Sequence, residues 1–223
     1  MPSICQNCGQ TNPAQASICV ACGHVLGSDC GSSFPSATCF VGRHEEMAAL
    51  QWQFATARSG HGSLVLLAGE MGSGKTRLVR EYVQSLSQDE AVVMWGSCYE
   101  GDWRPPYGPW IEALRPRVTS IDPATLYRAL GPEIWSLLLL LPELRATWPD
   151  VSAPPALSQE QERLRLFDAI AQFLLVTSRE KPLLLVFDDL HWADPDSLRL
   201  LSHVSHSLRH MRAMMVGIYR DAE

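Results

Sequence analysis

The segment Gly69–Thr76 constrains the fold of this 223-residue chain more than any other feature. It reads GEMGSGKT and fits the pattern GxxxxGK[ST] without a mismatch. Glycines let the backbone wrap until its N–H groups point inward at phosphate oxygens, and a helix that begins there adds the positive end of its dipole. Such a loop requires a buried strand before it and a helix after it. The apolar run Ser63–Ala68 and the helix-like segment 75–87 meet both requirements.

The loop pattern predicts a role for each of its residues. Lys75 is expected to meet the β- and γ-phosphates, and the Thr76 hydroxyl is expected to ligate Mg²⁺. The alternative is a Gly-rich turn without a ligand. With Gly at about 7% of average sequences, a chance match is rare, and the flanking strand and helix make it rarer. The remaining residues are predicted to surround the phosphates with backbone, and they are Gly69, Glu70, Met71, Gly72, Ser73 and Gly74.

Two acids, Asp188 and Asp189, end the apolar run Leu183–Phe187. Ligands of parallel sheets bind where the strands end. In an enzyme with a phosphate loop, the first acid holds Mg²⁺ and the second can polarise the attacking water. The alternative is an ordinary Asp-Asp turn. We expect the next segment to be structural: Asp194 as a helix cap, with His191 and Trp192 packing the turn.

The other segments alternate between helix and strand. Helices are predicted at 43–57, from a capping box at Ser158 and Gln161 to about 178, and after Asp194-Pro195. Strands are predicted at 91–96 and 213–219, and several short helices in the Pro- and Trp-rich stretch 97–157. Alternating elements indicate a mainly parallel sheet. Residues 39–223 are therefore predicted to form an α/β, three-layer P-loop NTPase domain.

The N-terminal segment 1–26 carries two CxxC pairs, each followed by glycine. This spacing favours a tetrahedral structural zinc site, a zinc ribbon, over disulfides or a redox CxxC. Because 1–26 contains no Lys or Arg, its composition favours a protein contact over a nucleic-acid contact. Residues 27–38 are Gly/Ser-rich and predict a flexible linker. The zinc ligands would be Cys5, Cys8, Cys19 and Cys22, leaving Cys30, Cys39 and Cys98 as unligated thiols.

Charge and hydropathy narrow the partners. The net charge of −6 and the pI near 5.6 argue against nucleic-acid binding through bulk electrostatics. The N-terminus lacks an apolar signal region, and the longest apolar run, Leu137–Leu141, is too short to span a bilayer. A cytoplasmic protein without membrane contact is the expectation.

Several motifs together resemble STAND-type signalling ATPases, which are relatives of AAA+ and Orc1-like ATPase domains. Phe40–Glu46 (FVGRHEE) looks like their N-terminal motif, and Leu184–Asp194 (LLVFDDLHWAD) is similar to their Walker B region. The stretches Pro106–Trp110 and Val216–Glu223 are similar to recurring segments of the group, and so is the ribbon pattern. The resemblance implies that Arg43 lies near the base and sugar and that Arg220 is a sensor reaching toward the γ-phosphate. His44 and Ile218 depart from the usual residues.

The leading hypothesis is a regulatory ATPase that uses ATP, Mg²⁺ and Zn²⁺ and acts as a signalling or transcriptional switch. ATP is favoured over GTP because no NKxD-like guanine motif occurs and because of the resemblance. One alternative is a zinc-ribbon interaction module with a nucleotide-binding but non-hydrolysing remnant. Others are a fragment of a nucleotide-cyclase-associated ATPase and, less favoured, a DNA-associated initiator. The domain is expected to be truncated after Glu223, without its lid, so the partner would be an unknown protein or a C-terminal effector region.

Overall fold

The computed structural model describes residues 3–4, 11–12, 42–87, 89–101 and 105–221. The chain divides into two compact units, 1–41 and 42–223. In the first unit, strands β1 (Ser3–Ile4) and β2 (Thr11–Asn12) pair antiparallel. The four predicted zinc cysteines, the predicted linker and residues 39–41 lie outside the described residues. The zinc ribbon and the linker therefore stay predictions.

A four-stranded sheet forms the centre of the second unit. Its strands are β3 (Ser63–Leu67), β4 (Val92–Ser97), β5 (Leu183–Asp188) and β6 (Ala213–Ile218). The order is β3-β6-β5-β4, and every neighbouring pair is parallel. This confirms the predicted α/β fold with a parallel sheet. Strand β6 lies between β3 and β5, so the carboxyl ends of strands that are far apart in sequence lie side by side.

Helices follow the strands much as the pattern predicts. Ser158 and Gln161 form the expected capping box, and Asp194 caps the next helix by accepting from the backbone N–H groups of Asp196 and Ser197. Short 3₁₀ turns occupy Gly131–Glu133, Pro142–Thr147, Leu190–Trp192 and Leu208–His210. The α-helices are α1 (His44–Arg58), α2 (Lys75–Ser85), α3 (Gly108–Ser120), α4 (Pro123–Leu130), α5 (Ile134–Leu140), α6 (Gln159–Glu180) and α7 (Pro195–Ser207).

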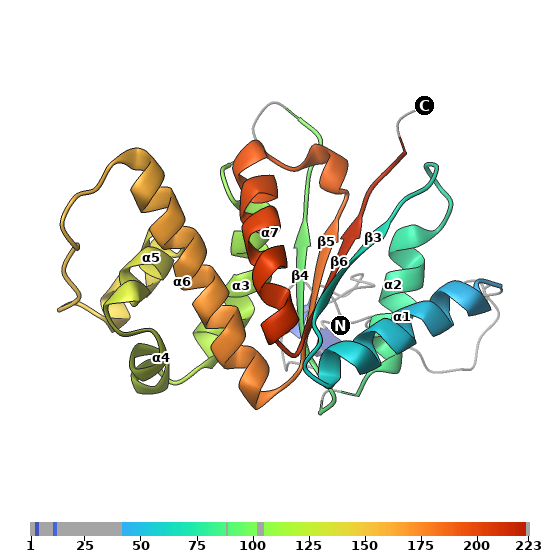
Figure 1. Ribbon diagram of the computed structural model, residues 1–223, viewed down its shortest axis with the longest axis horizontal. Helices are drawn as coiled ribbons and strands as arrows, with labels where there is room; N and C mark the ends of the chain where they lie inside the picture. Colours follow the sequence, from blue (N-terminus) through green and yellow to red (C-terminus); the bar gives the residue numbers. More distant parts are fainter. Residues whose placement is uncertain (1–2, 5–10, 13–41, 88, 102–104, 222–223) are drawn as a thin grey trace. The chain divides into compact units, whose positions relative to one another are not determined.

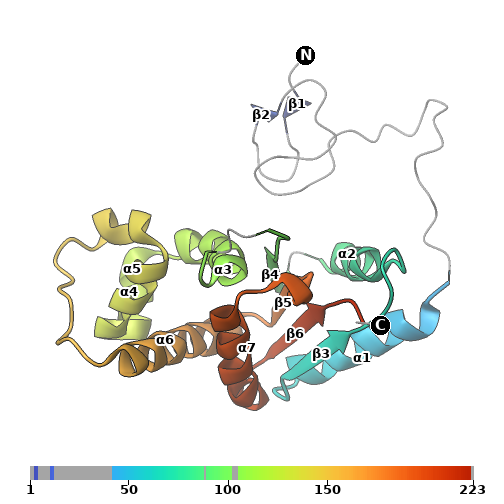
Figure 2. The ribbon, with the colours of Figure 1, turned by 90° about the horizontal axis from the view of Figure 1, so that it is seen from above.

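The helices form a layer on each side of the sheet (Figures 1 and 2). All six residues of β5 are buried, so this strand is covered on both faces. Phe187 lies on the face of α3, α6 and α7, with its ring 4.6 Å from that of Trp110. On the opposite side α1 and α2 meet through Phe54 and Tyr82, whose ring centroids are 6.3 Å apart. The three-layer architecture is thereby confirmed.

A helical lobe is inserted between β4 and β5. Helices α4 and α5 and the first half of α6 extend away from the sheet, on the left of Figure 1. Apolar side chains such as Leu126, Ile134 and Ile170 are buried here. They belong to the same core cluster as Phe187 on the sheet. The lobe is therefore packed continuously with the domain that carries the loop and the acids.

The Pro-Tyr-Gly-Pro-Trp stretch attaches α3 to the sheet. The Trp110 indole is buried and donates from Nε1 to the Ser197 carbonyl at 3.1 Å. A Cβ at Gly96 would lie 2.0 Å from the Pro109 carbonyl oxygen, so the backbones of β4 and α3 approach too closely for any side chain. Glycine at position 96 is thus a packing requirement of this contact.

Replacement of that glycine is expected to destabilise the fold. Gly96→Ala forces the two backbones apart, which should cost about 1–3 kcal/mol of unfolding free energy and lower Tm by ~3–10 °C. Gly108→Ala is the matched control, because its Cβ would meet nothing nearer than Pro105 Cγ at 3.5 Å. Thermal unfolding followed by circular dichroism measures both. Equal melting temperatures for the two variants would contradict the packing argument.

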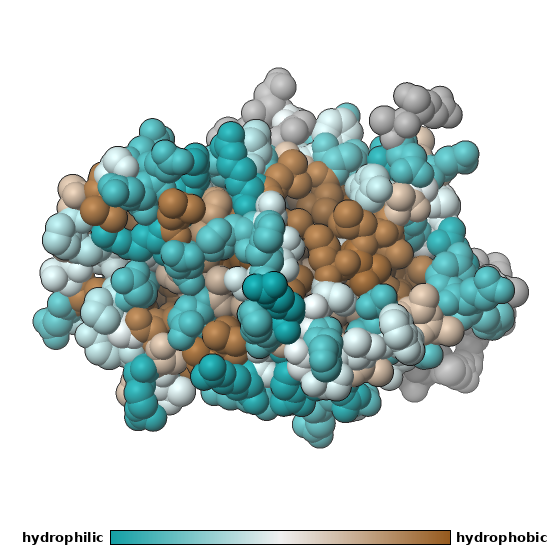
Figure 3. All heavy atoms as spheres, viewed as in Figure 1, coloured by the Kyte–Doolittle hydropathy of each residue, from teal (hydrophilic) through white to brown (hydrophobic). Residues whose placement is uncertain are grey.

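Apolar side chains are also exposed beside α7 (Figure 3). Leu66 of β3 is 53% exposed and Leu198 of α7 is 43% exposed. Leu66 contacts the position that a Gly217 Cβ would occupy, as does Leu190, so they share one face of the sheet. The β3 end of this face is thus less covered than the β5 centre. Among the described residues, no helix is long and apolar enough to cross a membrane.

Candidate functional site

The loop Gly69–Gly74 connects β3 to α2 and has the conformation that its glycines permit. Gly69, Gly72 and Gly74 have φ angles of 147°, 75° and 84°, a region that L side chains rarely adopt. The carbonyl of Gly74 accepts from the Leu78 N–H at 2.9 Å, so α2 starts directly at the loop. The N–H groups of the first turn of α2 have no intrahelical partner, which suits an anion at this end.

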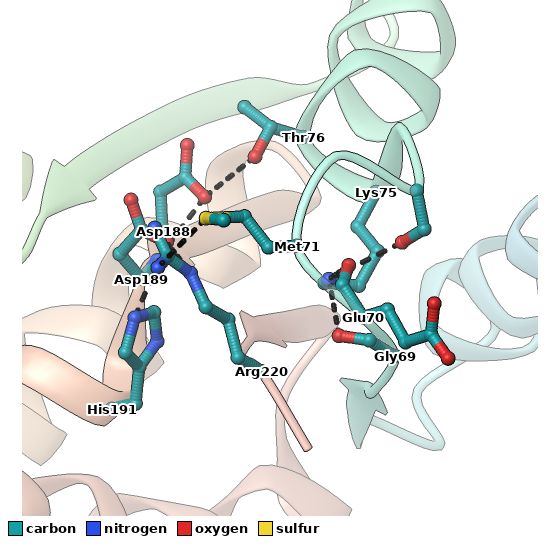
Figure 4. Close-up of polar contacts among 10 residues, drawn as sticks. Gly69, Glu70, Met71, Lys75, Thr76, Asp188, Asp189, His191 and Arg220 are labelled. Atoms are coloured by element: carbon teal, nitrogen blue, oxygen red, sulfur yellow. Dashed lines mark hydrogen bonds and ion pairs between the residues drawn. The ribbon is translucent and has the colours of Figure 1, made fainter. Parts of the chain in front are cut away.

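Lys75 is buried with its ammonium group inside the loop. Its side chain is on the first residue of α2, and the residue is only 8% exposed. Nζ donates to the carbonyls of Gly69 at 2.6 Å and Glu70 at 2.8 Å, and to Ser73 Oγ at 3.3 Å. In the unliganded protein, backbone carbonyls of the loop thus hold the Lys75 ammonium group (Figure 4). The oxygens of a bound phosphate would compete with these carbonyls for it.

Thr76 and Asp188 meet across the site. The Thr76 hydroxyl donates to Asp188 Oδ1 at 2.9 Å, although 112 positions separate the two residues in sequence. The sheet order explains the contact, because β3 and β5 flank β6 and all three strands end at the same edge. A hydroxyl beside a carboxylate at the end of a phosphate loop is a donor set that suits Mg²⁺.

The Asp188 carboxyl is costly to ionise in this position. Asp188 is 7% exposed, and burial raises its pKa; the hydrogen bond from Thr76 lowers the pKa, and the neighbouring Asp189 charge raises it again. Since the folded pKa lies above the unfolded value, the stability contribution of this group is present at low pH and is lost as pH rises through the folded pKa. At neutral pH the buried Asp188 carboxyl group therefore lowers the stability of the unliganded protein.

Removal of this charge should stabilise the unliganded protein. We expect Asp188→Asn to raise Tm by about 1–4 °C at pH 7 in the absence of Mg²⁺ and nucleotide, while weakening Mg²⁺ binding. Asp168→Asn is the control, because the Asp168 side chain is 73% exposed. Differential scanning calorimetry distinguishes the two variants. A Tm below that of the wild type for Asp188→Asn would contradict the stated sign.

Asp189 lies beside Asp188 with a different environment. Its backbone is left-handed, with φ of 54°, and its N–H donates to Asp188 Oδ1 at 3.1 Å. The side chain is 43% exposed, and its Oδ1 lies 4.0 Å from Arg220 Nε. Arg220 follows β6 and also approaches Met71 Sδ from Nη1 at 3.4 Å. Arg220 thus contacts both the acid and the tip of the loop.

Arg43 also reaches the loop. It is the N-cap of α1 in a left-handed conformation, with φ of 56°. Its Nη2 donates to the Ser73 carbonyl in a short hydrogen bond, and Nη1 lies 4.0 Å from Glu46 Oε1. The structure therefore brings together the predicted residues of loop, acid pair and both arginines, which come from four separate chain segments.

Two further residues belong to this neighbourhood. His191, predicted to pack the turn, contacts the Trp192 ring at 5.2 Å, but its Nε2 also lies 3.8 Å from Asp189 Oδ1. Cys98 is a buried free thiol whose N–H donates to the Asp188 carbonyl at 2.9 Å. Burial and then the Asp194 charge raise the pKa of its thiol to about 12, so it is protonated. The sequence signal that could have placed both residues near the site is that Cys98 follows the end of β4 and His191 follows the end of β5.

The arrangement combines three features that a magnesium triphosphate requires. Positive-φ glycines leave backbone N–H groups free to face an anion, a buried ammonium supplies compensating charge, and the Thr76–Asp188 pair supplies oxygen ligands for a divalent cation. Asp189 is placed beside this group without being bonded to Thr76 or Lys75. The residues present therefore fit nucleotide and Mg²⁺.

Comparisons with known proteins found a relative, solved structures and a family model that resemble this chain. A relative, an uncharacterised protein of Rhizobium meliloti (strain 1021), is 24% identical over an alignment of 218 residues; the match covers 91% of this chain and 20% of the relative. The chain thus spans about a fifth of the length of that relative.

Two solved structures resemble the chain at 12% identity, each over 79% of it. One is C. elegans PCH-2, with a TM-score of 0.39 and 37% of that chain covered. The other is Drosophila ORC bound to AT-rich DNA and Cdc6, with a TM-score of 0.37 and 47% covered. Scores of this size support no inference about function.

A protein-family model also matches most of the chain. Residues 39–216 match the family model described as AAA ATPase domain. The matched range contains the phosphate loop, the Thr76–Asp188 pair and Asp189. The chain belongs to the AAA ATPase domain family.

Proposed function

We propose that this chain binds ATP with Mg²⁺, hydrolyses it, and acts as a nucleotide-dependent regulatory switch of STAND type. The observation that carries the proposal is the Thr76–Asp188 hydrogen bond of 2.9 Å beside the buried Lys75 ammonium. A cation site and a phosphate site next to each other at one sheet edge fit a magnesium triphosphate better than either ligand alone.

The hydrolytic part of the proposal assigns roles to residues of this chain. Lys75 turns from the Gly69 and Glu70 carbonyls to the phosphates and neutralises their charge. Bound Mg²⁺ supplies further charge neutralisation on the phosphoryl oxygens. Asp189, half-exposed and not bonded to Thr76, aligns the attacking water and accepts its proton.

The switching part rests on Arg220 and Arg43. Arg220 lies between Asp189 and Met71, so an anion at the loop would compete with Asp189 for the guanidinium. Its displacement would couple the phosphate state to the end of β6. Arg43, which holds the Ser73 carbonyl, would connect the start of α1 to the same loop and lie near the base and sugar. An unknown protein or a C-terminal effector region would respond to these movements. We also propose a cytoplasmic location for the protein.

Hydrogen exchange tests the switch directly. The full chain is compared with Mg²⁺ and either ADP or a non-hydrolysable ATP analogue. We expect amides in residues 188–194 and 219–221 to exchange at least about 10-fold more slowly with the triphosphate, since they adjoin the terminal phosphate. Exchange that is identical in the two nucleotide states, with both nucleotides bound, would contradict the switch and leave binding intact.

We propose in addition that the N-terminal unit is a structural zinc ribbon. Two CxxC pairs in the first 26 residues support it, because a unit this small needs metal to fold. The purified chain is expected to contain about one zinc ion. Elemental analysis should show its loss in Cys19→Ser and retention in the control Cys30→Ser, with ATP affinity unchanged in both. Full zinc content in Cys19→Ser would contradict the proposal.

A further inference from the structure

His191 is turned back toward the strand ends by the turn that contains it. Asp189 has its left-handed backbone just before the 3₁₀ turn Leu190–Trp192, and the Trp192 N–H donates to the Asp189 carbonyl at 2.8 Å. The Ala193 N–H closes the turn on the Leu190 carbonyl at 3.0 Å. As a result the His191 ring points toward Asp189, near the Arg220 guanidinium (Figure 4).

The polar atoms of this ring are not satisfied. Nδ1 and Nε2 of His191 are both buried, and within the described ranges 42–87, 89–101 and 105–221 neither has a hydrogen-bond partner. The distance of 3.8 Å from Nε2 to Asp189 Oδ1 is too long for a hydrogen bond. Buried polar atoms are nearly always paired, so this imidazole is available to form a hydrogen bond when the site is occupied.

The same oxygen of Asp189 faces a second donor. Arg220 Nε lies 4.0 Å from Oδ1, about as far as His191 Nε2. Asp189 is therefore flanked by two donors, neither within hydrogen-bonding distance. A terminal phosphate at the loop would attract the guanidinium more strongly than a single carboxylate does, because its charge is larger. The imidazole then remains facing the carboxylate.

The electrostatic surroundings keep the imidazole neutral. Burial lowers the pKa of His191; the Asp189 carboxylate raises it, and the positive charges of Arg220 and Lys75 lower it again. A neutral imidazole has one N–H donor and one acceptor nitrogen. It can orient a carboxylate without neutralising it, whereas a second full cation would weaken the carboxylate as a base.

We propose that His191 is a positioning residue for hydrolysis: its Nε2–H donates to Asp189 Oδ1 when Arg220 turns to the terminal phosphate, and it holds the carboxylate against the attacking water. The inference rests on the proposed ATPase activity and adds a residue to it. It requires a shortening of about 1 Å between Nε2 and Oδ1 to reach normal hydrogen-bond length.

Two substitutions separate this role from simple packing. His191→Leu removes the donor and keeps an apolar side chain against Trp192, whereas His191→Gln retains an N–H donor at a similar reach. We expect His191→Leu to lower kcat about 10- to 100-fold with Kd for Mg·ATP within about threefold of the wild type, and His191→Gln to recover most of the loss. His206→Gln is the control, because His206 is exposed on α7 and its ring contacts the Ser202 carbonyl of the same helix.

A double-mutant cycle shows whether His191 acts through Asp189. In an Asp189→Asn background, His191→Leu should add less than about a twofold loss. Wild-type kcat for His191→Leu, or additive losses in the cycle, would overturn the proposal while the ATPase assignment stands. A parallel fall in Tm and affinity would also overturn it, in favour of a packing role. A wild-type chain that binds Mg·ATP without turnover would instead contradict the hydrolytic function and, with it, this inference.

Discussion

Lys75→Ala is expected to lower the affinity for Mg·ATP about 100-fold and to abolish measurable hydrolysis. In the unliganded protein the Lys75 ammonium has three oxygen acceptors, two of them backbone carbonyls of the loop. When ATP binds, negatively charged phosphate oxygens would take the place of these neutral acceptors. Alanine removes the charge-assisted bonds and leaves the phosphates facing a loop without a cation.

Arg77→Ala is the matched control for this change. Arg77 lies on the same helix two residues later, is exposed, and forms an ion pair with Glu81 at 3.6 Å. Its removal makes the same change in net charge without touching the loop. Isothermal titration with Mg·ATP should therefore give a wild-type Kd for Arg77→Ala. A Kd for Lys75→Ala within threefold of wild type would refute the phosphate contact.

Asp189→Asn is expected to lower kcat about 100- to 1,000-fold while leaving the Kd for Mg·ATP within threefold. Asparagine keeps the shape of the side chain but cannot accept the proton of a water. Asp188 is not expected to substitute for it, because Asp188 is only 7% exposed and is the proposed ligand of Mg²⁺. Asp189, by contrast, is 43% exposed and open to water.

The control for this prediction is Asp168→Asn, which removes an exposed carboxylate paired with His203 at 2.9 Å. It should leave kcat and Kd unchanged. Single-turnover hydrolysis with each variant in excess over labelled ATP measures the chemical step apart from product release. Turnover of Asp189→Asn within threefold of the wild type would exclude Asp189 as the base.

Local sequence signals were sufficient for the elements themselves. The apolar run 183–187 predicted β5, and the Ser158 capping box predicted the start of α6. Strand order was beyond such signals. The position of β6 between β3 and β5 depends on its pairing with β3, which lies more than 100 residues earlier in the chain, and this order places Arg220 next to Asp189.

Within the site, sequence reasoning identified residue types better than their surroundings. The loop pattern and the Asp-Asp pair predicted the Thr76–Asp188 seat, which the structure brings to hydrogen-bonding distance. His191 packs against Trp192 as predicted, but its approach to Asp189 was not predicted, since the direction of its ring depends on the left-handed backbone of Asp189, a conformation that an Asp permits but does not require. The resemblance to a known family, rather than any local pattern, pointed to Arg43 and Arg220.

Titration calorimetry of the full 223-residue chain with ATP, in the presence and absence of Mg²⁺, tests the central claim most directly. The cradle formed by the loop, Lys75 and the Thr76–Asp188 pair predicts one ATP per chain, with affinity at least about 10-fold higher when Mg²⁺ is present. Folded protein that shows no binding at millimolar ATP with Mg²⁺ would contradict it.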